Sequence, residues 1–297
     1  MSTTRSLPIE EVLRQVQLPA LPQTAIHLLE LSRNSDNGPT EYAKPIEADP
    51  GLTGQILRFV NSSFFGFRTE VTSVKLAINL VGVRTIKKTS PCGAFVFSLL
   101  PSFKQGVFNI KLLWQDSLRR ALFAKALGKR LGADNEEDLF TAALLQDLAI
   151  PILVKELAQE YVQYIDLLQT DTMRLSMREH QSHGWTHADA GAFIAKKWKL
   201  PESLCRLIEN HTAIDERWGQ SKTMVGQLTV SLSALLPSSA FDRWHDQGEF
   251  LRVFAQQPAS RGSLDELFTQ VDRDMEQFAP LLKLTTPSRA LASYLVE

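Results

Sequence analysis

The chain has 297 residues, of which 44% are hydrophobic and 22% are charged, and its formal net charge is −1. This composition is typical of a globular protein and excludes disordered, collagen-like and membrane-embedded chains, while the length allows one large core or two packed lobes. The two cysteines, Cys92 and Cys205, show no metal-binding spacing, and Met1–Glu10 lacks the apolar run of a signal peptide. We therefore expect a cytoplasmic protein with no disulfide scaffold and no membrane contact.

Charge is distributed unevenly along the chain. Residues 75–130 carry a net charge of +10, against −2 for residues 1–74 and −9 for residues 131–297. One interpretation is a solvated side of a helix formed by Arg119, Arg120, Lys125, Lys129 and Arg130. The other is that the basic residues of this region bind an anionic partner, such as a nucleotide, a nucleic acid or an acidic protein surface. The second interpretation predicts that five residues gather on one exposed face: Arg84, Lys87, Lys88, Arg119 and Arg120.

Apolar residues recur mainly at helical spacing, and alternating strand-like runs are nearly absent, which predicts an all-α fold. In the first part of the chain, prolines and capping residues mark the starts of helices. We expect helices from Pro22 to about Ser32, from Asp49-Pro50 to Asn61, near 73–80 and near 83–100. The segment Pro101–Gly106 is predicted to be the seam between two lobes.

The second lobe is predicted to open with a helix over 110–131, with Asp116 on its flank. The next helix is apolar on nearly all sides, so we expect it at the centre of the lobe and expect Pro151 to end or kink it. Gln146 and Asp147 interrupt its apolar sequence. Because a buried carboxylate is costly unless it is hydrogen-bonded or bound to metal, Asp147 should have a specific partner.

Three of the six histidines are closely spaced: His180, His183 and His187. A helical zinc pair needs two histidines four residues apart on one helix. Gly184 interrupts this segment, and Thr186 with Asp189 predicts a capping box that starts a new helix at His187, so we reject a zinc site here. The helix dipole should favour the neutral form of His187. His211 is predicted near the end of the following helix.

A series of short motifs runs along residues 18–215. In the first lobe they are Leu18-Pro19-Ala20-Leu21-Pro22, Asp49-Pro50-Gly51-Leu52, Asn61-Ser62, Phe65-Gly66, Ser73, Ala77-Ile78 and Leu80-Val81-Gly82. In the second they are Trp114, Ser117, Leu144-Leu145-Gln146-Asp147, Thr186-His187-Ala188-Asp189-Ala190-Gly191, Trp198, Leu200-Pro201 and His211. In number and order these motifs resemble an HDOD protein, the bacterial signalling relative of the HD phosphohydrolases.

The resemblance implies an all-helical protein of two packed lobes. The implied parts are a lead-in at 1–17, an N-terminal helical lobe at 18–105, an HD-like lobe at 106–215 and a helical extension at 216–297 packed on the HD-like lobe. In the extension, Ser263-x-x-Glu266 predicts another capping box. Pro45 lies where the family usually has a helix, and we expect it to shorten or restart that element.

The resemblance also implies a metal site, which active HD enzymes build from a His on the first helix, a His-Asp pair on the central helix and a later Asp. Here the corresponding positions are Asp116, Gln146-Asp147 and the acid-free run Val230–Ser233. We therefore expect an inert site with no metal or other cofactor, in which a neighbouring histidine holds Asp147. The alternative is one divalent metal held by Asp147, His187 and His211. The positions of His187 and His211 serve a second metal or a phosphate in some HD relatives.

These observations predict a non-catalytic cytoplasmic signalling module that binds a partner protein or a small ligand. The alternative is a metal-dependent phosphohydrolase, for example of cyclic dinucleotides. A third interpretation is binding of nucleic acid through the basic residues 75–130, which would make affinity fall steeply with salt.

Overall fold

Helices are the only regular secondary structure in the part of the chain that this computed structural model describes, which confirms the predicted all-α fold. None of these helices combines the length and hydropathy needed to cross a membrane. The helix expected near 83–100 and the seam expected at Pro101–Gly106 lie outside the described residues. The described residues are 8–14, 27–28, 30–31, 36–61, 67, 69–81, 109–134, 136–168, 171, 173–215, 218, 221, 224–282 and 284–296.

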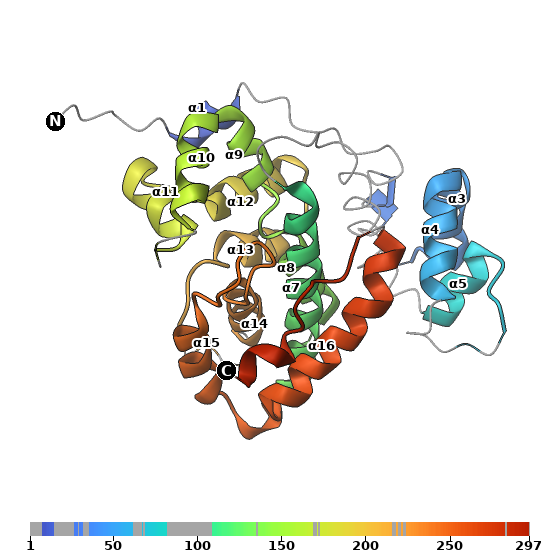
Figure 1. Cartoon of the computed structure of the whole chain (residues 1–297). Coiled ribbons are helices and arrows are strands. Elements are labelled where there is room, and N and C mark those ends of the chain that lie inside the picture. The colour runs from blue at the N-terminus through green and yellow to red at the C-terminus, as the bar shows by residue number, and fades with distance from the viewer. Residues whose placement is uncertain are drawn as a thin grey trace.

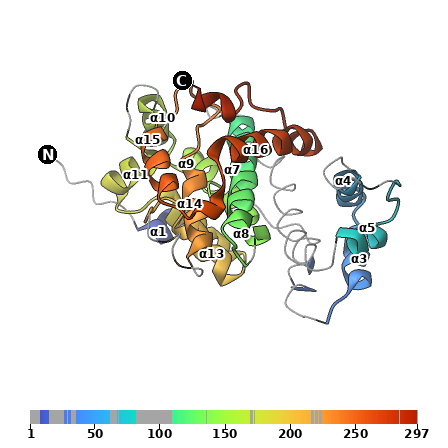
Figure 2. The same cartoon turned by 90° about the horizontal axis from the view of Figure 1, so that it is seen from below.

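Three short helices form a small group with its own core. They are α3 (Pro39–Glu47), α4 (Pro50–Val60) and α5 (Val74–Val81). Tyr42 and Ile78, both fully buried, pack in this core. Asp49 caps α4 as predicted, because its Oδ1 accepts a hydrogen bond from the Leu52 N–H at 3.0 Å. Figures 1 and 2 both show this group at one end of the molecule, on the side of α16 (Leu264–Phe278).

The expectation that Pro45 shortens or restarts its helix is wrong. Pro45 lies inside α3, which runs without a break to Glu47. A proline in a helix interior removes one backbone hydrogen bond and typically costs about 3 kcal/mol. Here its ring is buried on the same face as Tyr42 and Ile46, so the apolar contact offsets part of that cost.

The larger body is built around α7 (Ile110–Arg130), which begins after the predicted break. The Asn109 side chain caps α7 by accepting hydrogen bonds from two backbone N–H groups of its first turn. Three helices contact α7 along its length, and Figure 1 shows α7 running through the middle of this body. They are α8 (Glu136–Leu145), α14 (Val225–Ala234) and α16.

The central helix ends earlier than expected. Most side chains of α8 are buried, as its apolar sequence predicts, but the helix ends at Leu145, before the first of its two polar residues. Pro151 does not end this helix; it lies in the first turn of the next one, α9 (Ile150–Glu156). A proline ring would clash with the Asp147 carbonyl in a continuous helix. That carbonyl instead accepts the Ile150 N–H at 3.0 Å in a tight turn over 146–149.

Four helices follow α9 along the chain, and each contacts the next one. They are α10 (Ala158–Leu167), α11 (Leu175–His183), α12 (His187–Lys197) and α13 (Glu202–Glu209). The short helix α1 (Ile9–Arg14), from the segment expected to be a lead-in, contacts α12, and its Ile9 and Leu13 are buried in the core of the larger body. The larger body therefore includes a segment from the start of the chain.

The break between α11 and α12 has the predicted geometry. Gly184 has a φ of 77°, a left-handed conformation that favours glycine and ends α11. Thr186 then caps α12, and Asp189 completes a capping box by accepting the Thr186 N–H at 2.7 Å. His187 is consequently the first residue of α12, which fixes where its side chain points.

The C-terminal segment is helical and packs on α7. Its remaining elements are α15 (Gln247–Ala255), η2 (Ala259–Arg261), η3 (Ala279–Leu282) and η4 (Ala292–Leu295). Phe123 of α7 meets Phe250 and Phe268 with ring centroids 5.6 Å and 6.1 Å away, which places large aromatic side chains across this contact. The Ser263 hydroxyl caps α16 by accepting the Glu266 N–H, which is the serine half of the predicted capping box.

Candidate functional site

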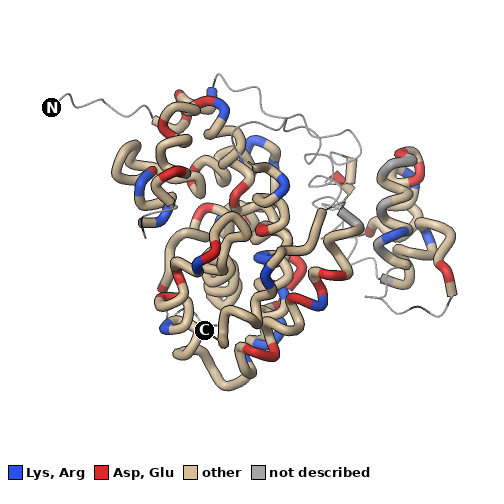
Figure 3. The backbone as a smooth tube through the Cα atoms, in the orientation of Figure 1, with Lys and Arg blue, Asp and Glu red and all other residues tan. Residues whose placement is uncertain are grey.

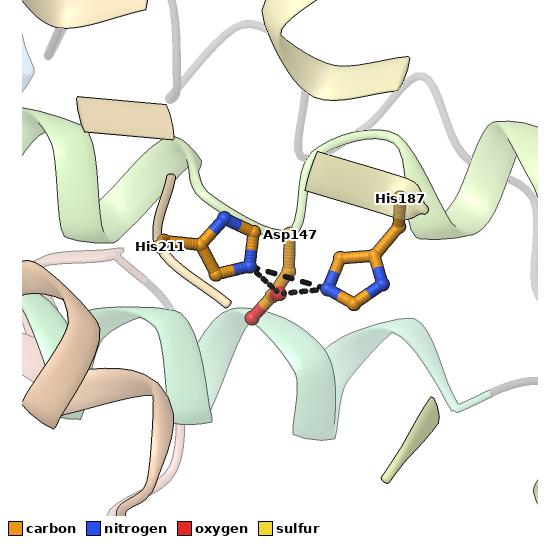
Figure 4. Close-up of side chains that lie close together, drawn as sticks. All are labelled: Asp147, His187 and His211. Atoms are coloured by element: carbon orange, nitrogen blue, oxygen red, sulfur yellow. Dashed lines mark hydrogen bonds and ion pairs between the residues drawn. The ribbon is translucent and has the colours of Figure 1, made fainter. Parts of the chain in front are cut away.

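Three buried side chains from three different parts of the chain meet at one point. Asp147 comes from the turn after α8, His187 from the first position of α12, and His211 from the turn after α13. Asp147 Oδ1 lies 3.4 Å from the Nε2 of each histidine, and the two Nε2 atoms are 3.2 Å apart (Figure 4). Their side chains are at most 7% exposed. We call these residues the triad.

The other ring nitrogen of each histidine is already engaged. His187 Nδ1 lies 2.6 Å from a carboxylate oxygen of Glu179, and His211 Nδ1 lies 2.7 Å from the Ile208 carbonyl oxygen. Such contacts to carboxylates and carbonyls fix ring orientation and are typical of metal-binding histidines. Both Nε2 atoms are thereby turned toward Asp147.

Glu179 is a site residue that the sequence analysis missed. It is fully buried, and it accepts hydrogen bonds from the Tyr161 hydroxyl at 2.6 Å and from the His187 backbone N–H at 2.8 Å. Burial, and then the Glu179 charge, raise the pKa of Tyr161, so its hydroxyl keeps its proton. The only signal in the sequence was an acidic residue just before a predicted helix break, which is too common to indicate a site.

The expectation that His187 is neutral is wrong. Burial alone would lower its pKa, but the carboxylates of Glu179 and Asp147 outweigh burial and raise the pKa of His187 to about 10. The helix dipole is worth at most about 2 kcal/mol, whereas two carboxylates touch this ring in a buried site. The two carboxylates therefore favour the protonated form of His187.

Arg120 completes the surroundings of Asp147. Its guanidinium donates a hydrogen bond to Asp147 Oδ2, and the Arg120 side chain is only 15% exposed. Burial alone would raise the pKa of Asp147, but Arg120, followed by His187 and His211, holds it well below its usual value. The structure thus gives Asp147 the histidine contacts that we expected, and adds an arginine that we had placed elsewhere.

The proposed exposed basic face is not supported by α7. Arg119 is 2% exposed and donates to the carbonyl oxygens of Pro237 and Arg289, so it is unavailable to a partner, and Arg120 is engaged by Asp147. These two arginines therefore share neither an exposed binding face nor a solvated side of α7, and both expectations are wrong for them. Figure 3 shows acidic and basic residues interspersed over the described helices. The other three candidates lie outside the described part of the chain: Arg84, Lys87 and Lys88.

Asp116 is buried rather than on an open flank. It is 5% exposed, and its carboxylate accepts hydrogen bonds from the Ser238 hydroxyl at 2.6 Å and the Ser239 N–H at 2.9 Å. Asp116, which the resemblance places at the first ligand position, thus fastens the C-terminal segment to α7. The neighbouring contacts of Arg119 serve the same purpose.

Gln146, where the resemblance implies a histidine, faces Ser233, which belongs to the run Val230–Ser233 where the resemblance implies a terminal aspartate. Both are fully buried, and the Ser233 hydroxyl lies 3.3 Å from Gln146 Oε1 and 2.7 Å from the Val230 carbonyl oxygen. Gln146 Nε2 is buried with no hydrogen-bond partner among the described residues. An amide and a hydroxyl bring no charge to balance a cation, so this half of the pattern does not fit a metal.

The triad, in contrast, fits one metal ion. Its donor atoms form a triangle with edges of 3.2 to 3.4 Å, and a metal at about 2.0–2.1 Å from nitrogen and oxygen ligands needs donors at about this separation. Two imidazoles and one carboxylate suit zinc, iron or cobalt better than magnesium or calcium. The described residues could therefore hold a single divalent transition metal.

The triad lines a cavity of about 370 Å³, and so do Asp116 and Arg120. The C-terminal segment forms another wall through Phe241, Arg243 and Trp244. Arg243 is exposed and makes no ion pair with the described residues, so it offers a free positive charge at this wall. A cavity of this size accommodates a small molecule.

Comparison with known proteins places these features in a family context. The HDOD domain family profile matches residues 18–214. The fold is similar to that of an HDOD domain protein of unknown function from Geobacter sulfurreducens, with a TM-score of 0.64, 19% identity, and coverage of 97% of this chain and 91% of that one. It is also similar to a provisionally assigned phosphohydrolase from Shewanella amazonensis SB2B, with a TM-score of 0.66, 19% identity, and coverage of 92% and 99%.

A curated relative, an uncharacterized protein from Treponema pallidum (strain Nichols), is 24% identical over 198 residues. That match covers 64% of this chain but only 37% of the relative. The chain therefore spans little more than a third of that relative's length.

Proposed function

The chain belongs to the HDOD domain family, and from this premise we propose that it is a non-catalytic regulatory module that binds a signalling partner protein or a small ligand. The HD-like scaffold would serve recognition rather than hydrolysis. The cytoplasmic location inferred from the sequence is part of this proposal.

The proposal depends on the side-chain contacts of the residues at the positions where the HD pattern has metal ligands. Gln146 and Ser233 contact each other as neutral groups, and Asp116 is committed to Ser238 and Ser239. Asp147, the remaining carboxylate of the pattern, is neutralised by Arg120. Phosphodiester hydrolysis by an HD site depends on metal to activate water and stabilise developing charge, and these contacts leave at most one metal position.

The test has two arms. Protein purified without chelator is analysed for metal content, and hydrolysis of cyclic dinucleotides and of a generic phosphodiester is measured with added manganese, iron or magnesium. We expect no turnover above that of the Asp147→Ala variant. Turnover that requires metal and disappears in Asp147→Ala would contradict the non-catalytic proposal.

The second candidate is a metal-dependent phosphohydrolase. The triad favours it, because a metal held there would polarise a phosphate oxygen and lower the pKa of bound water. In that function Asp147, His187 and His211 would hold the ion, Glu179 would orient His187, and Arg120 would be released from Asp147. The single ion and the neutral Gln146–Ser233 pair make this the weaker candidate.

The cavity beside the triad is the proposed contact region for a small ligand. Arg243→Ala should weaken binding of an anionic ligand at this wall, whereas Lys129→Ala, which removes an exposed charge from the end of α7, should not. Isothermal titration with ligands found in a thermal-shift screen measures both effects. Nucleic acid is the least supported partner, because Arg119 and Arg120, two of the five residues proposed for it, are engaged inside the protein.

A further inference from the structure

Arg120 reaches the triad from the same helix face as Asp116, one turn further along α7. Among the described residues, the Arg120 guanidinium donates a hydrogen bond to Asp147. Arg120 Nε is buried and has no hydrogen-bond partner among the described residues. The guanidinium also lines the cavity. The contact is thus specific to Asp147, and the side chain has open space beside it.

The two oxygens of Asp147 face different groups. Oδ1 lies 3.4 Å from the Nε2 atoms of His187 and His211, whereas Oδ2 receives Arg120. A divalent ion in the triad would sit on the Oδ1 side, next to a carboxylate that already has a cationic partner. Two cations that share one buried carboxylate repel each other strongly, because water screens them little there.

Arg120 and a metal ion would compete for one carboxylate. Asp147 is the carboxylate of the triad, and its Oδ2 already accepts a hydrogen bond from the Arg120 guanidinium. A divalent ion in the triad would therefore meet a carboxylate whose charge an arginine already balances. Without Arg120, the carboxylate would be left to the ion alone.

We infer that Arg120 is the resident cation of this site: it neutralises Asp147 in place of a metal ion and keeps the triad free of divalent metal at micromolar concentrations. The inference rests on the proposed function and deepens it, because it names the residue that separates this site from a metal-loaded relative. The triad retains its geometry as a latent metal site of the zinc, cobalt or iron class.

The test compares metal binding by the wild-type protein with that by Arg120→Gln. Isothermal titration with Zn²⁺ and the visible absorption of bound Co²⁺ provide two readouts that do not depend on activity. We expect Arg120→Gln to bind one ion per chain, with affinity higher than that of the wild type by a factor of roughly 100. The matched control is Lys129→Gln, which removes an exposed charge from the same helix and should bind as weakly as the wild type.

Two further variants define the site and separate charge from shape. Asp147→Asn in the Arg120→Gln background should abolish the gain. Arg120→Lys keeps a cation and should bind as weakly as the wild type; tight binding by this variant would overturn the inference. If Arg120→Gln does not fold, as judged by circular dichroism, Arg120→Met keeps the apolar stem and replaces it.

The wild-type protein is also a test by itself. Stoichiometric Zn²⁺ binding at micromolar concentration that is lost in Asp147→Asn would overturn the inference, and so would equal affinities of the wild type and Arg120→Gln. These binding results test only the role of Arg120. The proposed function is contradicted by phosphodiesterase turnover, which is measured separately. The two failures are therefore distinguishable.

Discussion

The two halves of the HD-like site differ in how their polar groups are held. In the triad half, Asp147 and His187 are charged, and each is contacted by a group of opposite charge from another element. In the other half, Gln146 and Ser233 are neutral, Gln146 Nε2 lacks a partner among the described residues, and Asp116 fastens the C-terminal segment. Both halves are buried to a similar degree.

The difference lies in the kind of contact: charged groups hold the triad half, and neutral groups meet in the other half. Buried charges cannot be left unpaired, so Asp147 and His187 require Arg120 and Glu179. A neutral buried group that lacks a hydrogen bond lowers the free energy of unfolding less than an unpaired buried charge does. The triad half should therefore be sensitive to single substitutions, and the other half should be tolerant.

Glu179→Ala is expected to have the largest effect. It leaves protonated His187 and the Tyr161 hydroxyl without their buried acceptor, and breaking a buried ion pair typically costs about 3–5 kcal/mol of unfolding free energy. Urea unfolding followed by circular dichroism measures the change. The control Glu202→Ala removes an exposed ion pair with Arg206 and should cost less than about 1 kcal/mol. Equal costs for the two variants would contradict the difference between the halves.

The pH dependence of stability should reveal the charge on His187. Its pKa is raised to about 10 in the folded protein from 6.5, so the folded state keeps a proton that the unfolded state loses, and stability falls as pH rises from about 6.5 to 10. The slope approaches about 1.4 kcal/mol per pH unit. Unfolding in EDTA between pH 7 and pH 9 measures it. His187→Gln should lack this part of the slope, and an unchanged slope would show that His187 is neutral.

Asp116→Asn should have a moderate effect that is confined to stability. An amide oxygen can still accept one hydrogen bond from Ser238 or Ser239, but the charge-assisted contact is lost, at a cost of about 1–2 kcal/mol. Because Asp116 lies outside the triad, Asp116→Asn should not change Co²⁺ binding in the Arg120→Gln background. Loss of that binding would place Asp116 among the metal ligands.

Gln146→Met should have the smallest effect. Gln146 Nε2 already lacks a partner among the described residues, so an apolar side chain of similar length removes a poorly paired amide. The expected change in unfolding free energy is less than about 1 kcal/mol in either direction. A loss greater than about 2 kcal/mol in urea unfolding would mean that this half also depends on its polar contacts.

Local signals in the sequence predicted helix ends well where capping residues act on their own backbone. Thr186 and Ser263 start α12 and α16 because their hydroxyls reach N–H groups two or three residues away. The same reasoning failed at Pro151. We expected this proline to end or kink the central helix, but it lies in the first turn of α9, after the turn that separates the two helices. The reasoning failed for Pro45 because burial against Tyr42 and Ile46 is a tertiary effect.

The sequence by itself determined the all-helical class, because helical periodicity is a property of neighbouring residues. Its resemblance to HDOD proteins made Asp147, His187 and His211 candidates for one site. Only the tertiary structure decided the charges and partners of these residues. Arg120 precedes Asp147 by 27 positions and Glu179 precedes His187 by 8, across a helix break. No local pattern encodes such a meeting, because it depends on how α7, α11 and α12 pack around a turn. Because an unpaired buried charge is costly in free energy, these partners determine whether the site is stable.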